Sequence, residues 1–341
     1  MKYQFPTIII GVLAGAAPFV FGQAASTIHA DKVVGYERCE ECHEEEVKAW
    51  KLSSHARSNN VHQDAKTREK AQEIASKMGL ANASAMSTSP LCTECHYTRQ
   101  ETGGATKTIS GVSCESCHGG GKDFYEVHGD KEKIPSREER QKLSKAAGML
   151  YPHDTALVAE NCFNCHIIRD EKLVNVGGHP ARSKGFNLVS WTQGEVRHNF
   201  YTPDHERTKG KNLETVQSRK RKLFVVGMLL DLEYSLRSLS KGRTGGGEFR
   251  KAMGTRANTI IKKELPAVIK GLGGDGAPAE ILEITKIADG VKLSGDPAQV
   301  AAAADAIKPL VVKFSEGTDG SNLGGVDGFL PPNSKGKAWQ P

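Results

Sequence analysis

The stretch Cys39-Glu-Glu-Cys-His43 is followed by three others of the same form, Cys92-Thr-Glu-Cys-His96, Cys114-Glu-Ser-Cys-His118 and Cys162-Phe-Asn-Cys-His166. These four motifs contain all eight cysteines of the 341-residue chain. Disulfides and zinc sites also use paired cysteines, but Cys-x-x-Cys-His is the signature of haem c attachment. We therefore predict four covalently attached haem c groups. The predicted thioether-forming residues are Cys39, Cys42, Cys92, Cys95, Cys114, Cys117, Cys162 and Cys165.

The histidine of each motif is the expected ligand on one face of its iron, and the ligand on the other face sets the haem potential. A vacant face would instead let a small molecule bind. The motif histidines are His43, His96, His118 and His166. Seven further histidines lie in the same region: His55, His62, His128, His153, His179, His198 and His205. Because spare histidines outnumber the irons, we expect histidine on both faces.

The composition divides the chain after the first 30 residues. Residues 31–206 hold every cysteine and eleven of the twelve histidines, and between 31 and 130 no three apolar residues are consecutive. Such a segment cannot build an ordinary core, so haems would supply one; we expect a tetrahaem cytochrome c domain at 31–206. Residues 211–316 lack Cys and His and show helical periodicity, which predicts an α-helical domain. Residues 317–341 are rich in Gly, Pro, Ser and Asn and predict a flexible tail.

The predicted fold class is mostly α: a multihaem cytochrome c domain with little regular sheet, followed by a helical bundle. Apolar residues at helical spacing predict helices within the haem region and in the C-terminal part. The expected ranges are 44–57, 67–78, 213–239, 248–271, 277–290 and 297–315.

The N-terminus has the layout of a secretory signal. Lys2 precedes an apolar stretch from Ile8 to Phe21, and Gly22-Gln23-Ala24 supplies small residues for cleavage. We expect residues 1–24 to be a signal peptide and the protein to be periplasmic or extracellular. An uncleaved anchor is the alternative, and it is the expected route to any membrane association.

The net charge of +6 is too weak to indicate nucleic acid binding. Residues 206–270, however, contain 16 Lys and Arg against 6 Asp and Glu, including four consecutive cations at 219–222. This segment is either a solvated helix face or a docking surface for an acidic redox partner.

Three segments resemble the tetrahaem cytochrome c-554 family. In the first, Trp50 and His55-Ala56 follow His43 by seven and twelve residues; in the second, Gly111-Val-Ser-Cys-Glu-Ser-Cys-His-Gly is followed by His128. The third is Glu195-Val-Arg-His198. The resemblance covers about residues 39–200 and leaves out the C-terminal helices.

The resemblance implies which histidine completes each iron. His55 would be the second ligand of the haem at His166, His128 of the haem at His43, and His198 of the haem at His118. It also implies haems in stacked and perpendicular pairs, and it allows the iron at His96 to stay open.

His179 is our candidate for the iron at His96, the iron that this assignment leaves without a second ligand. Gly177 and Gly178 allow a tight approach, and Pro180 fixes the chain after it. His62, His153 and an open iron remain the alternatives.

Three functions follow from these patterns. An exported electron carrier is favoured, because enough histidines exist to close every iron. The first alternative is an oxidoreductase acting on a small nitrogen oxide or similar ligand at one open haem iron. The second is an assembly module whose helical domain docks the haem domain. Whether the protein is an enzyme is thus undecided by the sequence.

Overall fold

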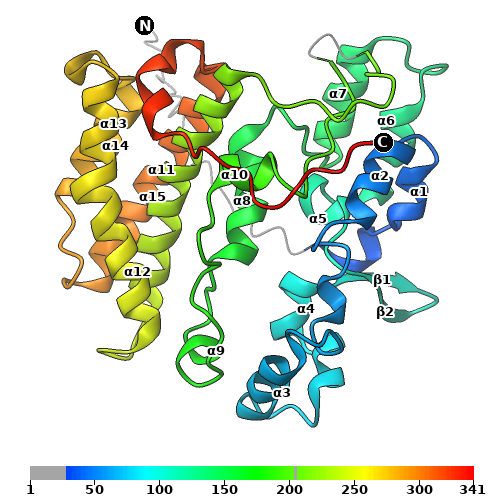
Figure 1. Cartoon of the computed structure of the whole chain (residues 1–341), viewed down its shortest axis with the longest axis horizontal. Coiled ribbons are helices and arrows are strands. Elements are labelled where there is room, and N and C mark those ends of the chain that lie inside the picture. Colours follow the sequence, from blue (N-terminus) through cyan, green and yellow to red (C-terminus); the bar gives the residue numbers. More distant parts are fainter. Residues whose placement is uncertain (1–27, 203–205) are drawn as a thin grey trace, which may run out of the picture.

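The computed structural model describes residues 28–202 and 206–341. The predicted signal peptide and His205 lie outside these residues. Fifteen α-helices and one two-stranded sheet make up the regular structure of the described part, so the mostly α fold class is confirmed. Figure 1 shows the helices of the first three motifs on one side of the molecule, the long C-terminal helices on the other, and the helix of the fourth motif between them.

The cysteine-rich region consists of short helices joined by loops. Its α-helices are α1 (Tyr36–Glu40), α2 (Glu44–Lys51), α3 (Arg68–Lys77), α4 (Pro90–His96), α5 (Cys114–His118), α6 (Tyr125–Gly129), α7 (Arg137–Ala146), α8 (Thr155–His166), α9 (Glu171–Asn175) and α10 (Leu188–Thr192). Short 3-10 helices lie at Ala30–Lys32, Ser58–Asn60, Ala83–Ser87 and Gly121–Asp123.

The single sheet is an antiparallel hairpin of β1 (Thr98–Thr102) and β2 (Ala105–Ser110). Gly103 and Gly104 form its turn with φ of 61° and 75°, the conformation for which glycine is favoured in two-residue hairpins.

The helix expected at 44–57 ends earlier, at Lys51. Both the amide and the hydroxyl of Ser53 donate to Trp50 O, at 2.8 and 2.7 Å, and this local bonding competes with continuation of the helix. The chain then turns, and His55 lies in that turn rather than on a helix.

The C-terminal part is a bundle around one central helix, α11 (Gln217–Lys241). The other helices are α12 (Glu248–Thr259), a π-helical turn at Ile260–Glu264, α13 (Leu265–Gly271), α14 (Ala279–Asp289) and α15 (Pro297–Gly317). α11 packs against α15, α12, α8 and α10. Its residues from Val225 to Leu236 are buried on every face, as expected for a helix surrounded by others.

The main hydrophobic core crosses the expected domain boundary at 206–211. It joins Phe163 of α8 and Leu188 of α10 to Leu229 and Phe249 of the C-terminal helices. The C-terminal bundle therefore packs directly on the segment that carries the fourth motif.

The tail expected to be loose, 317–341, is packed in the structure. A 3-10 helix at Ser321–Phe329 inserts Leu323 and Val326, both fully buried, against the bundle. The chain then crosses back to the cysteine motifs and ends near α2 (Figure 1). The Gly- and Pro-rich composition indicates an irregular backbone, but backbone hydrogen bonds and a few buried apolar side chains still fix it.

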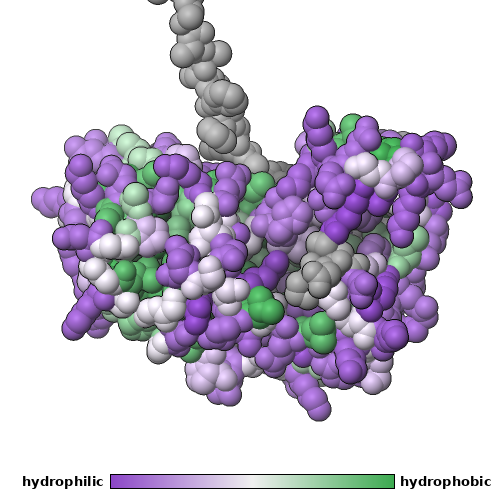
Figure 2. Space-filling model, turned by 90° about the horizontal axis from the view of Figure 1, so that it is seen from above, coloured by the Kyte–Doolittle hydropathy of each residue, from purple (hydrophilic) through white to green (hydrophobic). Residues whose placement is uncertain are grey.

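None of the described helices is long and apolar enough to span a membrane. The face shown in Figure 2 is mostly hydrophilic, with hydrophobic residues in small separate groups.

Candidate functional site

Each Cys-x-x-Cys-His motif forms a helical turn at the end of a helix. α4, α5 and α8 end on His96, His118 and His166. In the first motif, the His43 amide donates to Cys39 O at 2.9 Å, which continues the turn between α1 and α2. Residues three apart lie on one face of a helix, so both thiols of a motif point to the same side. This arrangement suits two thioethers along one haem edge beside the following histidine.

Every motif histidine faces one histidine from a distant part of the chain. The distances between ring centroids are 6.1 Å for His43 and His128, 6.0 Å for His166 and His55, 6.4 Å for His96 and His179, and 6.3 Å for His118 and His198.

These spacings match two imidazoles on opposite faces of one iron. A metal–nitrogen bond of about 2 Å and a nitrogen-to-centroid distance of about 1.1 Å give a centroid separation of about 6.2 Å. The structure thus brings together all four pairs considered in the sequence analysis.

The Nδ1 atoms of several of these histidines are held by neighbouring oxygens. His118 Nδ1 lies 2.9 Å from Leu150 O, His179 Nδ1 lies 2.8 Å from Pro180 O, and His198 Nδ1 lies 2.7 Å from Val196 O. A carbonyl oxygen only accepts, so Nδ1 must carry the proton. The Nε2 lone pair then remains available for a metal, as is usual for metal-binding histidines.

Ser183 and Tyr151 hold two more histidines of the set. Ser183 Oγ lies 2.8 Å from His166 Nδ1, and the Tyr151 hydroxyl lies 3.1 Å from His128 Nδ1. Ser183 and Tyr151 are not among the residues predicted from the sequence. Both lie in loops whose position depends on tertiary packing, and we find no sequence signal for them.

Burial keeps His96, His118 and His166 neutral. Removal from water lowers the pKa of His96 and His118 to about 4 and that of His166 to about 3. Only a neutral imidazole nitrogen can donate a lone pair to a metal, so this environment suits ligation.

The four motifs lie close to one another in two pairs. The thiols of Cys39 and Cys114 hydrogen-bond each other, which lowers the pKa of Cys39. Cys95 and Cys165 do the same, which lowers the pKa of Cys95. The first motif therefore adjoins the third, and the second adjoins the fourth.

A further contact joins these two pairs. Asn161 Nδ2, from the helix of the fourth motif, donates to Cys117 O of the third at 2.9 Å. His198 is also near enough to His55 for its charge to lower the pKa of His55. The order of adjacent motifs is first, third, fourth and second.

Two rival candidates for the iron at His96 make other contacts. His62 lies 3.3 Å from the hydroxyl of Tyr97, and the His153 ring stacks on Tyr151 at 5.4 Å. Neither contact is with a motif histidine.

The surroundings of the motifs fit haem groups. Within 28–155, the one hydrophobic cluster outside the main core is small and consists of Ala71, Ala75, Met86, Cys92 and Tyr97. The other buried apolar residues of this segment, Val33, Val47, Ala49, Phe124 and Tyr151, belong to neither cluster. All eight cysteines are free of disulfides.

Two buried guanidinium nitrogen atoms near the histidine pairs also fit haem. Arg182 Nη1 and Arg197 Nε have no hydrogen-bond partner within the described structure. They adjoin Ser183 and His198, respectively. Haem propionates are anionic acceptors of the kind that buried guanidinium groups need.

Comparison with known proteins agrees with this geometry. The family model described as "Cytochrome c554 and c-prime" matches residues 38–119, which include the first three motifs. Cytochrome c-554 of Nitrosomonas europaea is 27% identical over 170 residues, covering 46% of this chain and 66% of that protein, just under two thirds of its length. No solved structure matches the chain.

The family model does not reach the C-terminal helices, so it indicates no role for them. Similarity to a cytochrome c family supports covalently bound haem c at the matched motifs. The cysteine-rich part of this chain is therefore similar to cytochromes of the c-554 family.

Proposed function

We propose that this chain is an exported tetrahaem c-type cytochrome that transfers electrons between redox partners. The observation that carries the proposal is the set of four histidine pairs, each with ring centroids 6.0 to 6.4 Å apart. When bound, haem supplies the one-electron chemistry. The protein supplies the thioether cysteines and two histidines for each iron.

The proximity of the motifs supports a conducting role. Cys39 contacts Cys114 and Cys95 contacts Cys165, so the haems attached there would lie side by side. The contact between Asn161 and the third motif would bring the two pairs together. A continuous series of redox groups is what a carrier between a donor and an acceptor needs.

His179 decides between a carrier and an enzyme. With His179 opposite His96, the iron at His96 would be closed like the other three, and no iron would bind an external ligand. The alternative is an oxidoreductase acting on a small nitrogen oxide or similar ligand at an open iron, and it would require His179 to leave that position. The ring separation of 6.4 Å favours the carrier.

Export agrees with this role, since haem c is attached outside the cytoplasm. We propose that residues 1–24 direct the chain to the periplasm or the extracellular space.

We also propose that an acidic redox partner docks on exposed lysines of the 206–270 segment, such as Lys251, Lys263 and Lys270. Three of the four consecutive cations at 219–222 are bonded within the chain: Arg219 donates to Pro152 O, Lys220 pairs with Glu214 at 2.9 Å and Arg221 pairs with Asp327 at 2.6 Å. The depression around Cys42 is lined mostly by glutamates, so an acidic partner would avoid the first motif.

The test of the main proposal is a haem count with a spin-state count. Pyridine haemochrome and intact mass should give four haems per chain, and EPR of the oxidised protein should show low-spin iron throughout. Fewer than four haems would refute the tetrahaem assignment. A high-spin iron in the unaltered protein would favour the oxidoreductase alternative.

A further inference from the structure

The last residues of the chain form a strap across the loop that carries His198. After the 3-10 helix Ser321–Phe329, the chain has no regular secondary structure, yet it returns to the cysteine motifs (Figure 1). The loop from Gln193 to Val216 is equally irregular in its described residues. The direction of the His198 side chain is therefore not fixed by a helix or strand of its own.

The strap has a first anchor at Lys335. The Lys335 amide donates to Ser190 O at 2.7 Å, and the Glu195 amide donates to Lys335 O at 3.0 Å. Gly194 makes this approach possible, because a Cβ there would lie 1.9 Å from Lys335 O.

The second anchor is a set of hydrogen bonds between the chain end and Asn212. The backbone amide of Asn212 donates to Gln340 Oε1 at 3.2 Å, and Gln340 Nε2 donates to the backbone oxygen of Asn212 at 3.0 Å. Asn212 Nδ2 also donates to Trp339 O at 2.9 Å. The Trp339 ring lies 6.0 Å from that of Phe200, two residues beyond His198.

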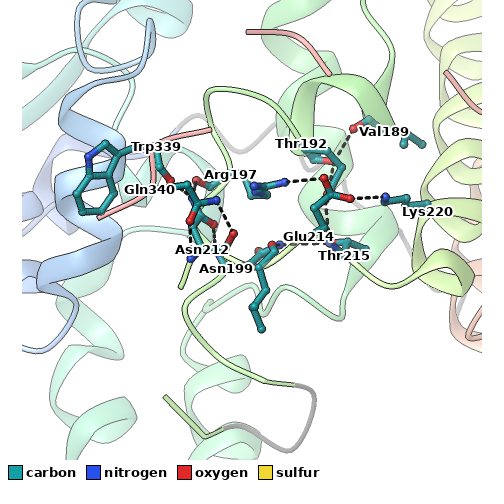
Figure 3. A network of polar contacts seen from close by, with 12 residues as sticks. Val189, Thr192, Arg197, Asn199, Asn212, Glu214, Thr215, Lys220, Trp339 and Gln340 are labelled. Atoms are coloured by element: carbon teal, nitrogen blue, oxygen red, sulfur yellow. Dashed lines mark hydrogen bonds and ion pairs between the residues drawn. The ribbon is translucent and has the colours of Figure 1, made fainter. Parts of the chain in front are cut away.

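The same Asn212 side chain bonds both neighbours of His198 (Figure 3). Its Nδ2 donates to Arg197 O at 2.7 Å, and its Oδ1 accepts from the Asn199 amide at 2.8 Å. Asn212 is only 3% exposed, so water cannot easily replace these bonds. The buried side-chain amide of Asn212 is thus hydrogen-bonded to the backbone on each side of His198 and to the end of the chain.

We infer that residues 335–341 and Asn212 form a clamp that positions His198 opposite His118. The inference rests on the proposed function, in which His198 is the second ligand of the third haem. Asn212 does not touch the iron in this account; it is a positioning residue that acts through the backbone of residues 197 and 199.

The test uses the full-length, haem-loaded protein and its variant Asn212→Ala, with potassium cyanide as the probe. If cyanide binds only when His198 is released, its binding rate follows the population of the released state. Each lost hydrogen bond, worth about 1 kcal/mol, should raise that rate by about fivefold. EPR should show a new high-spin iron amounting to at most one haem in four, with the haem count unchanged.

Further variants locate the effect. Gln340→Ala and a chain ending at Ser334 should act in the same direction, whereas Asn333→Ala, a change at an exposed strap residue, should behave like the unaltered protein. The double variant Asn212→Ala with His198→Ala should have one high-spin iron, as His198→Ala alone does. Two high-spin irons would mean that Asn212 acts on another haem, and the clamp would be refuted.

Failure of the clamp differs from failure of the ligand assignment. If His198→Ala creates a high-spin iron but Asn212→Ala and Gln340→Ala do not speed cyanide binding, the clamp is wrong and the assignment stands. If His198→Ala leaves the spectrum unchanged, the ligand assignment itself is wrong, and the clamp falls with it. If the shortened chain does not accumulate, the two point variants decide the question.

Discussion

Replacing His179 with alanine should open one iron and leave the other three unchanged. The His179 ring lies 6.4 Å from that of His96, close to the separation of about 6.2 Å expected for two imidazoles on one iron. One of four haems should therefore become high-spin, which is a quarter of the total iron.

The change should remain local. The hydrogen bond of His179 runs from Nδ1 to Pro180 O, at 2.8 Å, within its own loop. Its loss should lower the free energy of unfolding by only about 1 kcal/mol. The variant should keep four covalent haems and differ mainly in the ligand of one iron.

The assay is EPR of the oxidised protein before and after addition of cyanide, with nitric oxide as the probe of the reduced form. His62→Ala is the matched control, because His62 contacts Tyr97 and not a motif histidine. Four low-spin irons in His179→Ala would refute the assignment of His179. A high-spin iron already present without the substitution would refute closure of all four irons.

Three further predictions concern the rest of the fold. Asp231→Ala should lower the free energy of unfolding by about 3 kcal/mol, because it leaves the partly buried Arg182 without its carboxylate partner at 2.7 Å; a loss below about 1 kcal/mol in urea unfolding would contradict this. The hydrogen bond from Arg221 lowers the pKa of Asp327 to about 2, so the stabilisation is present above the unfolded pKa of about 4 and is lost as the pH falls towards 2. Asp327→Asn should accordingly be less stable than the unaltered chain at pH 7 and equal to it near pH 2, and an unchanged difference at both pH values would disprove the ion pair. Phe249→Ala should lower the free energy of unfolding by about 3–5 kcal/mol, because the Phe249 ring is fully buried in the main core; thermal unfolding by circular dichroism measures this loss. The haem absorbance spectrum at room temperature should stay the same.

The helices of the C-terminal part were predictable because their pattern is local. The expected ranges 277–290 and 297–315 compare with α14 at Ala279–Asp289 and α15 at Pro297–Gly317. Asp296 accounts for the start of α15, since its side chain accepts from the Ala298 amide and Pro297 occupies the first turn. Such signals act between residues a few positions apart, so they can be identified before the tertiary structure is known.

The tail was the main error of the sequence analysis. Gly, Pro, Ser and Asn at 317–341 indicate that no regular element forms, and beyond the 3-10 helix none does. Composition does not indicate which distant residues form hydrogen bonds with an irregular backbone segment. Lys335 and Gln340 are bound by residues of a distant loop, and nothing in their own neighbourhood signals this.

The sequence by itself determined where haem can attach, because two thiols and a histidine within five residues need only one helical turn to converge. It also predicted helices within residues 211–316, through apolar spacing. Only the tertiary structure decided that Asn212, Ser183 and Tyr151 lie beside the candidate iron ligands. These contacts join loops far apart in the chain and follow no period, so they exist only once α8, α10 and α11 have packed together. The physical reason is that attachment depends on local backbone geometry, whereas the position of a distant ligand depends on how the whole chain fills space.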